Sequence, residues 1–232
     1  MLTVKAKISG PLACFTRPET KVERVSYPVM TPSAARNILD AICWRPEMRW
    51  IVTSIAVLKP IKYISILRNE VQTKLAPGSI KKWMADAASY TPLAAGAGVD
   101  TDGTPRNSVL LRDVAYIVEA YPLIFNNSGD NTPAKYVAML QRRVEKGQCH
   151  YQPALGCREF AADFSPAEES DRPIEISEEL GRMLYDVAFL PEGNRAAFFD
   201  AVLRNGVMDT RPEVVLPDET RRQEVLQCSY KR

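Results

Sequence analysis

Two Thr-Pro pairs, Thr31-Pro32 and Thr132-Pro133, indicate where the two main helices of this chain begin. A threonine before a helix accepts a hydrogen bond from one of its first free amide groups, and proline fits the first helical position, where its missing N–H costs nothing. The first helix is then expected to stop before Pro46, and the second to run to about Lys146 and end at Gly147. Any fold must therefore hold two helices separated by a long β-rich region.

Strand patterns surround both helices. Residues 2–8 alternate apolar and polar side chains, residues 50–58 and 61–67 are rich in β-branched and aromatic residues, and residues 109–125 are strand-like. A further extended segment is expected at 149–160. The order of elements predicts an α+β fold, a ferredoxin-like (RRM-like) split βαβ sheet with helices on one face. A sheet of this kind is also a platform for RNA recognition.

The region between the strands contains an insertion. Residues 74–107 include the turn-forming sequences PGS, GAG and TDGTP and show little periodicity apart from a possible short helix near 79–88. We therefore expect residues 1–160 to form one domain that carries residues 74–107 as an inserted loop.

The remaining residues, 161–232, are expected to form a small second module and a tail. Residues 183–190 favour a strand, residues 194–203 favour a helix ended by Asn205-Gly206, and the charged last twenty or so residues favour a segment that runs over the surface.

The composition is that of an ordinary globular protein. The 232 residues are 46% hydrophobic and 25% charged, which excludes disordered, collagen-like and coiled-coil classes. No apolar run reaches the roughly 20 residues that a membrane helix needs. The first residues alternate like a strand and do not form the apolar block of a signal peptide. We expect a cytoplasmic protein without membrane contact.

Few side chains are suited to chemistry. The five cysteines show no CxxC spacing, which indicates reduced thiols, and the single histidine, His150, excludes a histidine-rich metal centre. Cys149 and His150 are adjacent in an extended segment and so point to opposite faces, which argues against a Cys/His nucleophile pair. The GxGxxG, P-loop, HExxH, GxSxG and EF-hand motifs are absent. We expect neither a metal nor a cofactor.

Positive charge is concentrated in the first two thirds of the chain. Residues 1–158 hold 21 Lys and Arg against 12 Asp and Glu, a net charge of +9, whereas residues 159–192 hold two Arg against ten acidic residues, a net charge of −8. Residues 59–82 and 135–158 are the most basic stretches. Two interpretations stay open, a groove that binds nucleic acid or the solvated faces of a nearly neutral protein.

RNA is a substrate that such a chain could cleave. Its own 2′-hydroxyl supplies the nucleophile, so scission needs in-line positioning, a proton acceptor, a proton donor and a cation at the phosphate, without a metal. Lys135 lies in the first turn of the second expected helix, where its ammonium joins free N–H groups and the positive end of the helix dipole. Lys135 is either a phosphate-binding residue or an ordinary solvent-exposed lysine.

Three stretches resemble a known family: residues 13–50 (ACFTRPETKVERVSYPVMTPSAARNILDAICWRPEMRW), 58–71 (LKPIKYISILRNEV) and 155–160 (LGCREF). They resemble the subtype I-C (Dvulg) member of the fifth CRISPR-associated protein family, in the RAMP superfamily, and the resemblance covers most of residues 2–210. It implies that the ferredoxin-like domain binds and cleaves RNA and that the second module is small and β-rich.

The resemblance also implies a function. Relatives are metal-independent endoribonucleases that cleave CRISPR repeat RNA, leave a 2′,3′-cyclic phosphate and stay on the 5′ handle of the guide RNA within the type I-C interference complex. An alternative is a non-catalytic RNA-binding subunit that caps the 5′ handle. A weaker alternative, from the basic residues at 59–82, is a general binder of double-stranded nucleic acid, which makes double-stranded DNA a candidate partner.

The site residues follow from the resemblance. Relatives have a Lys-His pair at the start of the second helix and a Tyr near the end of the first, and the matching residues here are Lys135, Tyr136 and Cys43. Lys135 would stabilise charge at the phosphate, and Tyr136 would donate a proton or orient a neighbour. Tyrosine and cysteine, with pKa values of about 10 and 8.5, are weak general bases at neutral pH, so slow cleavage is expected.

Further arginines and lysines in the matched blocks and on the second helix are candidates for RNA phosphate contacts. These residues are Arg17, Lys21, Arg24, Arg68, Arg142, Arg143 and Arg158. Phe15, Tyr27 and Trp44 are candidates to stack on bases, with a core position favoured for Trp44 because it lies beside a helix end.

Overall fold

The computed structural model describes residues 2–20, 22–71, 73–90, 103–125 and 131–227. Its elements, in chain order, are β1 (Val4–Ala13), α1 (Pro32–Ile42), β2 (Met48–Val57), β3 (Tyr63–Val71), α2 (Pro77–Ala85), η1 (Ala87–Ser89), β4 (Gly103–Ile124), α3 (Pro133–Glu145), β5 (Asp163–Ser165), β6 (Glu178–Leu190), β7 (Gly193–Arg204), β8 (Val207–Asp209), α4 (Pro212–Val215) and α5 (Glu219–Gln227).

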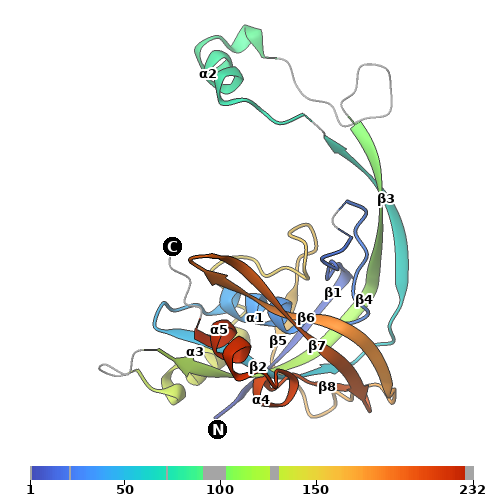
Figure 1. The fold of residues 1–232 in the computed structure, drawn as a ribbon, viewed down its shortest axis with the longest axis vertical. Helices are drawn as coiled ribbons and strands as arrows, with labels where there is room; N and C mark the ends of the chain where they lie inside the picture. Colours follow the sequence, from blue (N-terminus) through green and yellow to red (C-terminus); the bar gives the residue numbers. More distant parts are fainter. Residues whose placement is uncertain (1, 21, 72, 91–102, 126–130, 228–232) are drawn as a thin grey trace.

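The strands form one antiparallel sheet in the order β5-β1-β4-β2-β8-β7-β6, to which β3 is added by pairing with β4 (Figure 1). Helix α1 connects β1 to β2, and α3 connects β4 to β5. The two helices contact each other, and both contact the sheet, which places them on one face. The α+β class expected from the sequence is confirmed.

Both main helices begin where the Thr-Pro pairs predicted. The hydroxyl of Thr31 accepts a hydrogen bond from the N–H of Ala34 at 3.2 Å, and that of Thr132 accepts one from the N–H of Lys135 at 3.3 Å. Helix α1 is buried along most of its length, whereas α3 buries one face, made by Tyr136, Val137, Leu140 and Val144. The start of α3 is therefore free to form part of a surface site.

The carboxy-terminal part of the chain joins the same sheet. Strand β8 pairs with both β2 and β7, so the sheet continues into the β6–β7 hairpin. The helix expected at 194–203 is wrong, because these residues form β7. Pairing with β6 and alternate burial of Ala197, Phe199, Ala201 and Leu203 outweigh the helical propensity of this alanine-rich segment.

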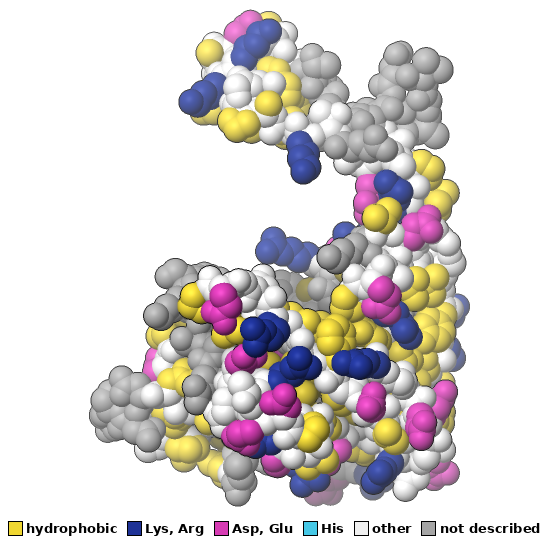
Figure 2. All heavy atoms as spheres, in the orientation of Figure 1, with side chains coloured by type: hydrophobic (Ala, Val, Ile, Leu, Met, Phe, Trp, Pro, Cys, Tyr) yellow, Lys and Arg dark blue, Asp and Glu magenta, His cyan; other side chains and the backbone are white. Residues whose placement is uncertain are grey.

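Strand β3 and the first half of β4 form an arm that extends away from the rest of the molecule (Figure 1). The expected insertion, 74–107, contains α2 and η1 at the outer end of the arm, while residues 103–107 already belong to β4. Residues 91–102 lie outside the described residues. Figure 2 shows Lys and Arg side chains next to hydrophobic ones at this end of the arm, and α2 buries none of its residues.

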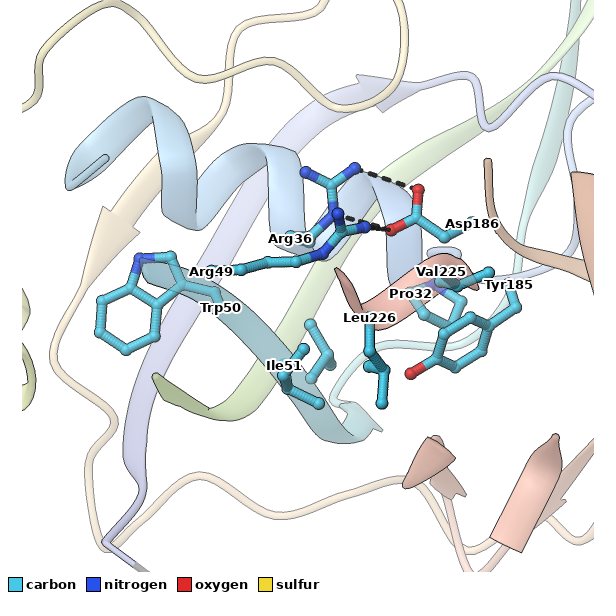
Figure 3. Close-up of a pocket in the computed structure, with 10 residues that line it drawn as sticks. Pro32, Arg36, Arg49, Trp50, Ile51, Tyr185, Asp186, Val225 and Leu226 are labelled. Carbon is cyan, nitrogen blue, oxygen red and sulfur yellow. Dashed lines mark hydrogen bonds and ion pairs between the residues drawn. The ribbon is translucent and has the colours of Figure 1, made fainter. Parts of the chain in front are cut away.

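A buried ion-pair network links helix α1 and the central strand β2 to the end strand β6 (Figure 3). Asp186 on β6 accepts hydrogen bonds from Arg36 on α1 and from Arg49 on β2, each at 2.7 Å. Arg36 also donates to Asp40, one helical turn along α1, at 2.8 Å. Because all four side chains are nearly excluded from water, removing one partner would leave an uncompensated buried charge.

None of the described helices has the length and apolar character needed to cross a membrane.

Candidate functional site

The first turn of α3 carries an exposed cation. The Lys135 ammonium donates to Asn131 Oδ1 at 3.4 Å and lies 5.6 Å from the centre of the Tyr136 ring. Within the described parts of the chain no carboxylate pairs with it. Because the dipole of α3 adds positive potential at the same place, the site is suited to an anionic group such as a phosphate.

Tyr136 lies directly beneath this cation. Its side chain is buried, and its hydroxyl lies 2.8 Å from Glu47 Oε1 and 2.7 Å from Asn131 Oδ1. Burial, followed by the hydrogen bond to Glu47, raises the pKa of Tyr136 to about 12. The phenol is therefore neutral near pH 7 and serves as a hydrogen-bond donor, not as a base.

Glu47 and Asn131 complete this group, which we call the helix-start site: Lys135, Tyr136, Glu47 and Asn131. Glu47 is half-buried just before β2, and its carbonyl accepts a hydrogen bond from the N–H of Phe125 at 2.9 Å. Neither Glu47 nor Asn131 was identified from the sequence. In the sequence, Glu47 stands out only as the single acidic residue between Arg45 and Arg49. The neighbouring residues do not indicate that its side chain faces α3.

Cys43 is close to the helix-start site without being part of its surface. It caps α1, its side chain is fully buried, and its carbonyl accepts a hydrogen bond from the indole N–H of Trp50 at 2.8 Å. Burial raises the pKa of the thiol. The structure thus brings Lys135 and Tyr136 together at the start of α3 and leaves Cys43 in the core below them.

The two arginines near the end of α3 differ. The Arg143 guanidinium donates to the carbonyl of Ile42 at the end of α1, so it links the two helices. Arg142 is exposed, and its side chain makes no hydrogen bond or ion pair to any described residue. Of the two, Arg142 is the one available to a ligand.

Four charged residues meet along the arm, where β3 lies beside the loops that hold Arg24 and Glu159, and we call them the arm-base cluster: Arg24, Arg68, Glu70 and Glu159. Arg24 Nη1 lies 3.4 Å from Glu159, and Arg68 pairs with Glu159 and, at 3.2 Å, with Glu70. The positive charges predicted here to contact RNA are thus already balanced by carboxylates.

The remaining predicted phosphate contacts lie apart from these groups. Arg17 sits 5.0 Å over the Tyr27 ring and 3.8 Å from Glu19. Arg158 is exposed and has no side-chain partner among the residues described. Lys21 lies outside the described residues.

The three aromatic candidates are placed differently from expectation. Phe15 and Tyr27 are buried in the core, whereas Trp44, for which a core position was favoured, is 36% exposed. Of the three, only Trp44 has its ring at the surface.

The chain belongs to a class of CRISPR-associated proteins. Residues 3–227 match the family model Cas_Cas5d, described as CRISPR-associated protein (Cas_Cas5), and the chain belongs to this family. The resemblance to its subtype I-C member noted in the sequence is confirmed.

Two curated relatives carry the same name, CRISPR pre-crRNA endoribonuclease Cas5d. The protein from Mannheimia succiniciproducens is 42% identical over 223 residues, covering 90% of this chain and 95% of the relative. The protein from Thermus thermophilus is 42% identical over 195 residues, covering 84% of this chain and 77% of the relative.

A solved structure shares the fold. It is described as the crystal structure of a CRISPR-associated protein and superposes with a TM-score of 0.61 at 24% identity, covering 90% of this chain and 91% of that one.

Proposed function

We propose that this chain is a cytoplasmic endoribonuclease that cleaves CRISPR repeat RNA into mature guide RNA. The observation that carries the proposal is the 42% identity, over most of the chain, to two proteins named pre-crRNA endoribonucleases. The exposed Lys135 at the start of a helix supplies the cation that the chemistry needs.

We interpret strands β5-β1-β4-β2 as the ferredoxin-like split βαβ sheet. Their antiparallel order and the crossovers through α1 and α3 support this interpretation. In this scheme residues 1–160 supply the RNA-binding and catalytic surface, residues 74–107 are an insertion carried on the arm, and residues 161–232 are the small carboxy-terminal module.

In the proposed reaction the 2′-oxygen of the nucleotide before the cut attacks the adjoining phosphorus, and the bond from phosphorus to the 5′-oxygen breaks. The products are a 2′,3′-cyclic phosphate and a 5′-hydroxyl. Negative charge grows on the non-bridging phosphate oxygens during this step, and Lys135 stabilises it together with the positive end of the α3 dipole. No metal takes part.

Glu47 is the proposed acceptor for the proton of the 2′-hydroxyl, because it supplies the carboxylate of the helix-start site, bonded to Tyr136 next to Lys135. The departing 5′-oxygen takes a proton from water, and Glu47 later returns its own proton to water. Tyr136 is a positioning residue, since its buried phenol acts on RNA only through the hydrogen bond that orients Glu47. Cys43 supports the site from the core.

RNA phosphates are proposed to contact Arg142 and Arg158 directly. They are proposed to contact the arm-base arginines, Arg24 and Arg68, by replacing the carboxylates of Glu70 and Glu159. After cleavage the protein stays on the 5′ handle as a subunit of the type I-C interference complex. Double-stranded DNA is a further candidate partner of the basic arm. Competition binding with unrelated duplex DNA against repeat RNA measures their relative affinities.

A second function, a non-catalytic subunit that caps the 5′ handle, is favoured by one observation. Two of the three positions matched to relatives are buried here, since neither Tyr136 nor Cys43 exposes its side chain. Under this alternative the chain binds repeat RNA and leaves it intact.

One incubation separates the two functions. Purified protein is mixed with the repeat RNA of its own CRISPR array in EDTA, and the product ends are analysed by phosphatase treatment and mass spectrometry. A single cut ending in a 2′,3′-cyclic phosphate is expected. Tight binding without a cut selects the capping function, and cleavage that EDTA abolishes contradicts the metal-independent mechanism.

A further inference from the structure

Two cysteines from distant parts of the chain are held together beside the arm-base cluster. The N–H of Cys14, at the end of β1, donates to the carbonyl of Leu155 at 3.0 Å. Gly156 follows with a φ of +87°, and a Cβ at this position would lie 1.9 Å from the carbonyl oxygen of Cys14. Only glycine permits this close approach, which places Cys157 next to Cys14.

The surroundings of the two thiols are polar. Thr16 Oγ1 lies 3.4 Å from the sulfur of Cys14 and 3.8 Å from that of Cys157, which itself lies 3.8 Å from the Cys14 carbonyl oxygen. Arg24 Nη1 donates to Cys157 Sγ at 3.1 Å. A guanidinium in direct contact with a sulfur favours the thiolate over the thiol.

The two thiols differ in charge and in access. The hydrogen bond from Cys14, with those from Thr16 and Arg24, lowers the pKa of Cys157 to about 6. The hydrogen bond with Cys157, followed by burial, raises the pKa of Cys14. Cys157 is half-buried, whereas Cys14 is 1% exposed. At neutral pH, Cys157 is therefore an accessible nucleophile with a protonated thiol behind it.

We propose that Cys157 and Cys14 form a peroxide-reactive dithiol site, in which Cys157 is oxidised first and Cys14 then forms the disulfide with it. The Cys157 thiolate attacks one oxygen of hydrogen peroxide, the O–O bond breaks, and Cys157 becomes a sulfenic acid while hydroxide leaves and takes up a proton to give water. The Cys14 sulfur then displaces the sulfenic oxygen, which leaves as a second water with the Cys14 proton. Two thiols are oxidised to one disulfide, and one peroxide is reduced.

This disulfide would fasten the end of β1 to the 154–161 segment, which carries Glu159 of the arm-base cluster. It would also remove the thiolate that holds Arg24. None of the residues of this thiol site belongs to the helix-start site, and Arg24 is shared with the arm-base cluster.

The first test measures alkylation of the full chain with iodoacetamide over a series of pH values, followed by peptide mapping. Cys149 is the internal control, because it is exposed and its thiol makes no hydrogen bond to a described residue. Cys157 is expected to reach half its maximal rate near pH 6, well below the ordinary range of a cysteine thiol. Arg24→Gln should move the Cys157 profile to higher pH, and Arg24→Lys should move it less.

The second test uses hydrogen peroxide under native conditions. A Cys14–Cys157 cross-linked peptide that dithiothreitol removes is expected, and Cys14→Ser should instead accumulate a dimedone-labelled sulfenic acid on Cys157. Cys149→Ser is the matched control and should leave both products unchanged, with circular dichroism confirming that each variant is folded. Equal profiles for Cys157 and Cys149, or peroxide oxidation without the Cys14–Cys157 link, would overturn the proposal.

Discussion

At the helix-start site the Lys135 ammonium has a neutral amide, Asn131, as its hydrogen-bond acceptor, whereas in the arm-base cluster Arg24 and Arg68 share the carboxylates of Glu70 and Glu159. A phosphate that reaches Lys135 displaces no anion. A phosphate that reaches the arm base must replace a carboxylate that already balances the guanidinium. Lys135, Arg24 and Arg68 each carry one positive charge, yet Lys135 should contribute more to RNA binding and cleavage than either arginine.

The largest effect is expected for Lys135→Ala. Losing the cation that stabilises charge at the phosphate should slow repeat cleavage by about 10²- to 10³-fold, while binding weakens only about threefold because many phosphate contacts remain. Single-turnover cleavage and filter binding measure the two quantities. Lys146→Ala, at the other end of the same helix, is the control, and equal cleavage by wild type and Lys135→Ala would remove Lys135 from the mechanism.

Glu47→Gln should have the next largest effect, a loss of about 10²-fold in the cleavage rate. The amide keeps a hydrogen bond with Tyr136 but cannot accept a proton. Tyr136→Phe should lower the rate by only about tenfold, as a positioning role requires. Cleavage by Glu47→Gln at the wild-type rate would contradict the assignment of Glu47 as the proton acceptor.

Salt dependence of binding sharpens the comparison of the cations. Arg142→Ala should reduce the slope of log affinity against log salt by about one unit, because Arg142 pairs with no described carboxylate and its full charge is available to a phosphate. Arg68→Ala should reduce it by less, and Glu159→Gln should strengthen binding by about twofold to threefold because the guanidiniums are released. Titrations over a range of KCl concentrations measure these slopes. Weaker binding by Glu159→Gln would show that the ion pairs position the arginines.

The smallest effect on cleavage is expected for Cys43→Ala, because its side chain is buried and does not reach the surface. The rate should stay within about threefold of wild type, while the free energy of unfolding falls by about 1 kcal/mol for the lost packing. Urea denaturation and single-turnover cleavage separate the two. A cleavage defect as large as that of Lys135→Ala would give Cys43 a direct role.

Several errors of the sequence interpretation share a cause. Residues 194–203 favour a helix locally, yet β6 and β8 provide partners that make them a strand. Phe15 and Tyr27 looked available for stacking, yet the segment after β1 folds them into the core, while Trp44 is left at the surface. In each case the outcome depends on residues far away in the chain, which a local pattern does not contain.

The sequence by itself determined where α1 and α3 begin, the α+β class and the family, because capping, strand periodicity and family motifs are local features. Only the tertiary structure decided that Glu47 faces Tyr136 across 89 positions of the chain, that Glu159 neutralises the arm-base arginines and that Cys157 meets Cys14. These contacts arise when the sheet and its two helices bring distant segments together. Burial and neighbouring charge then set which groups are available for chemistry.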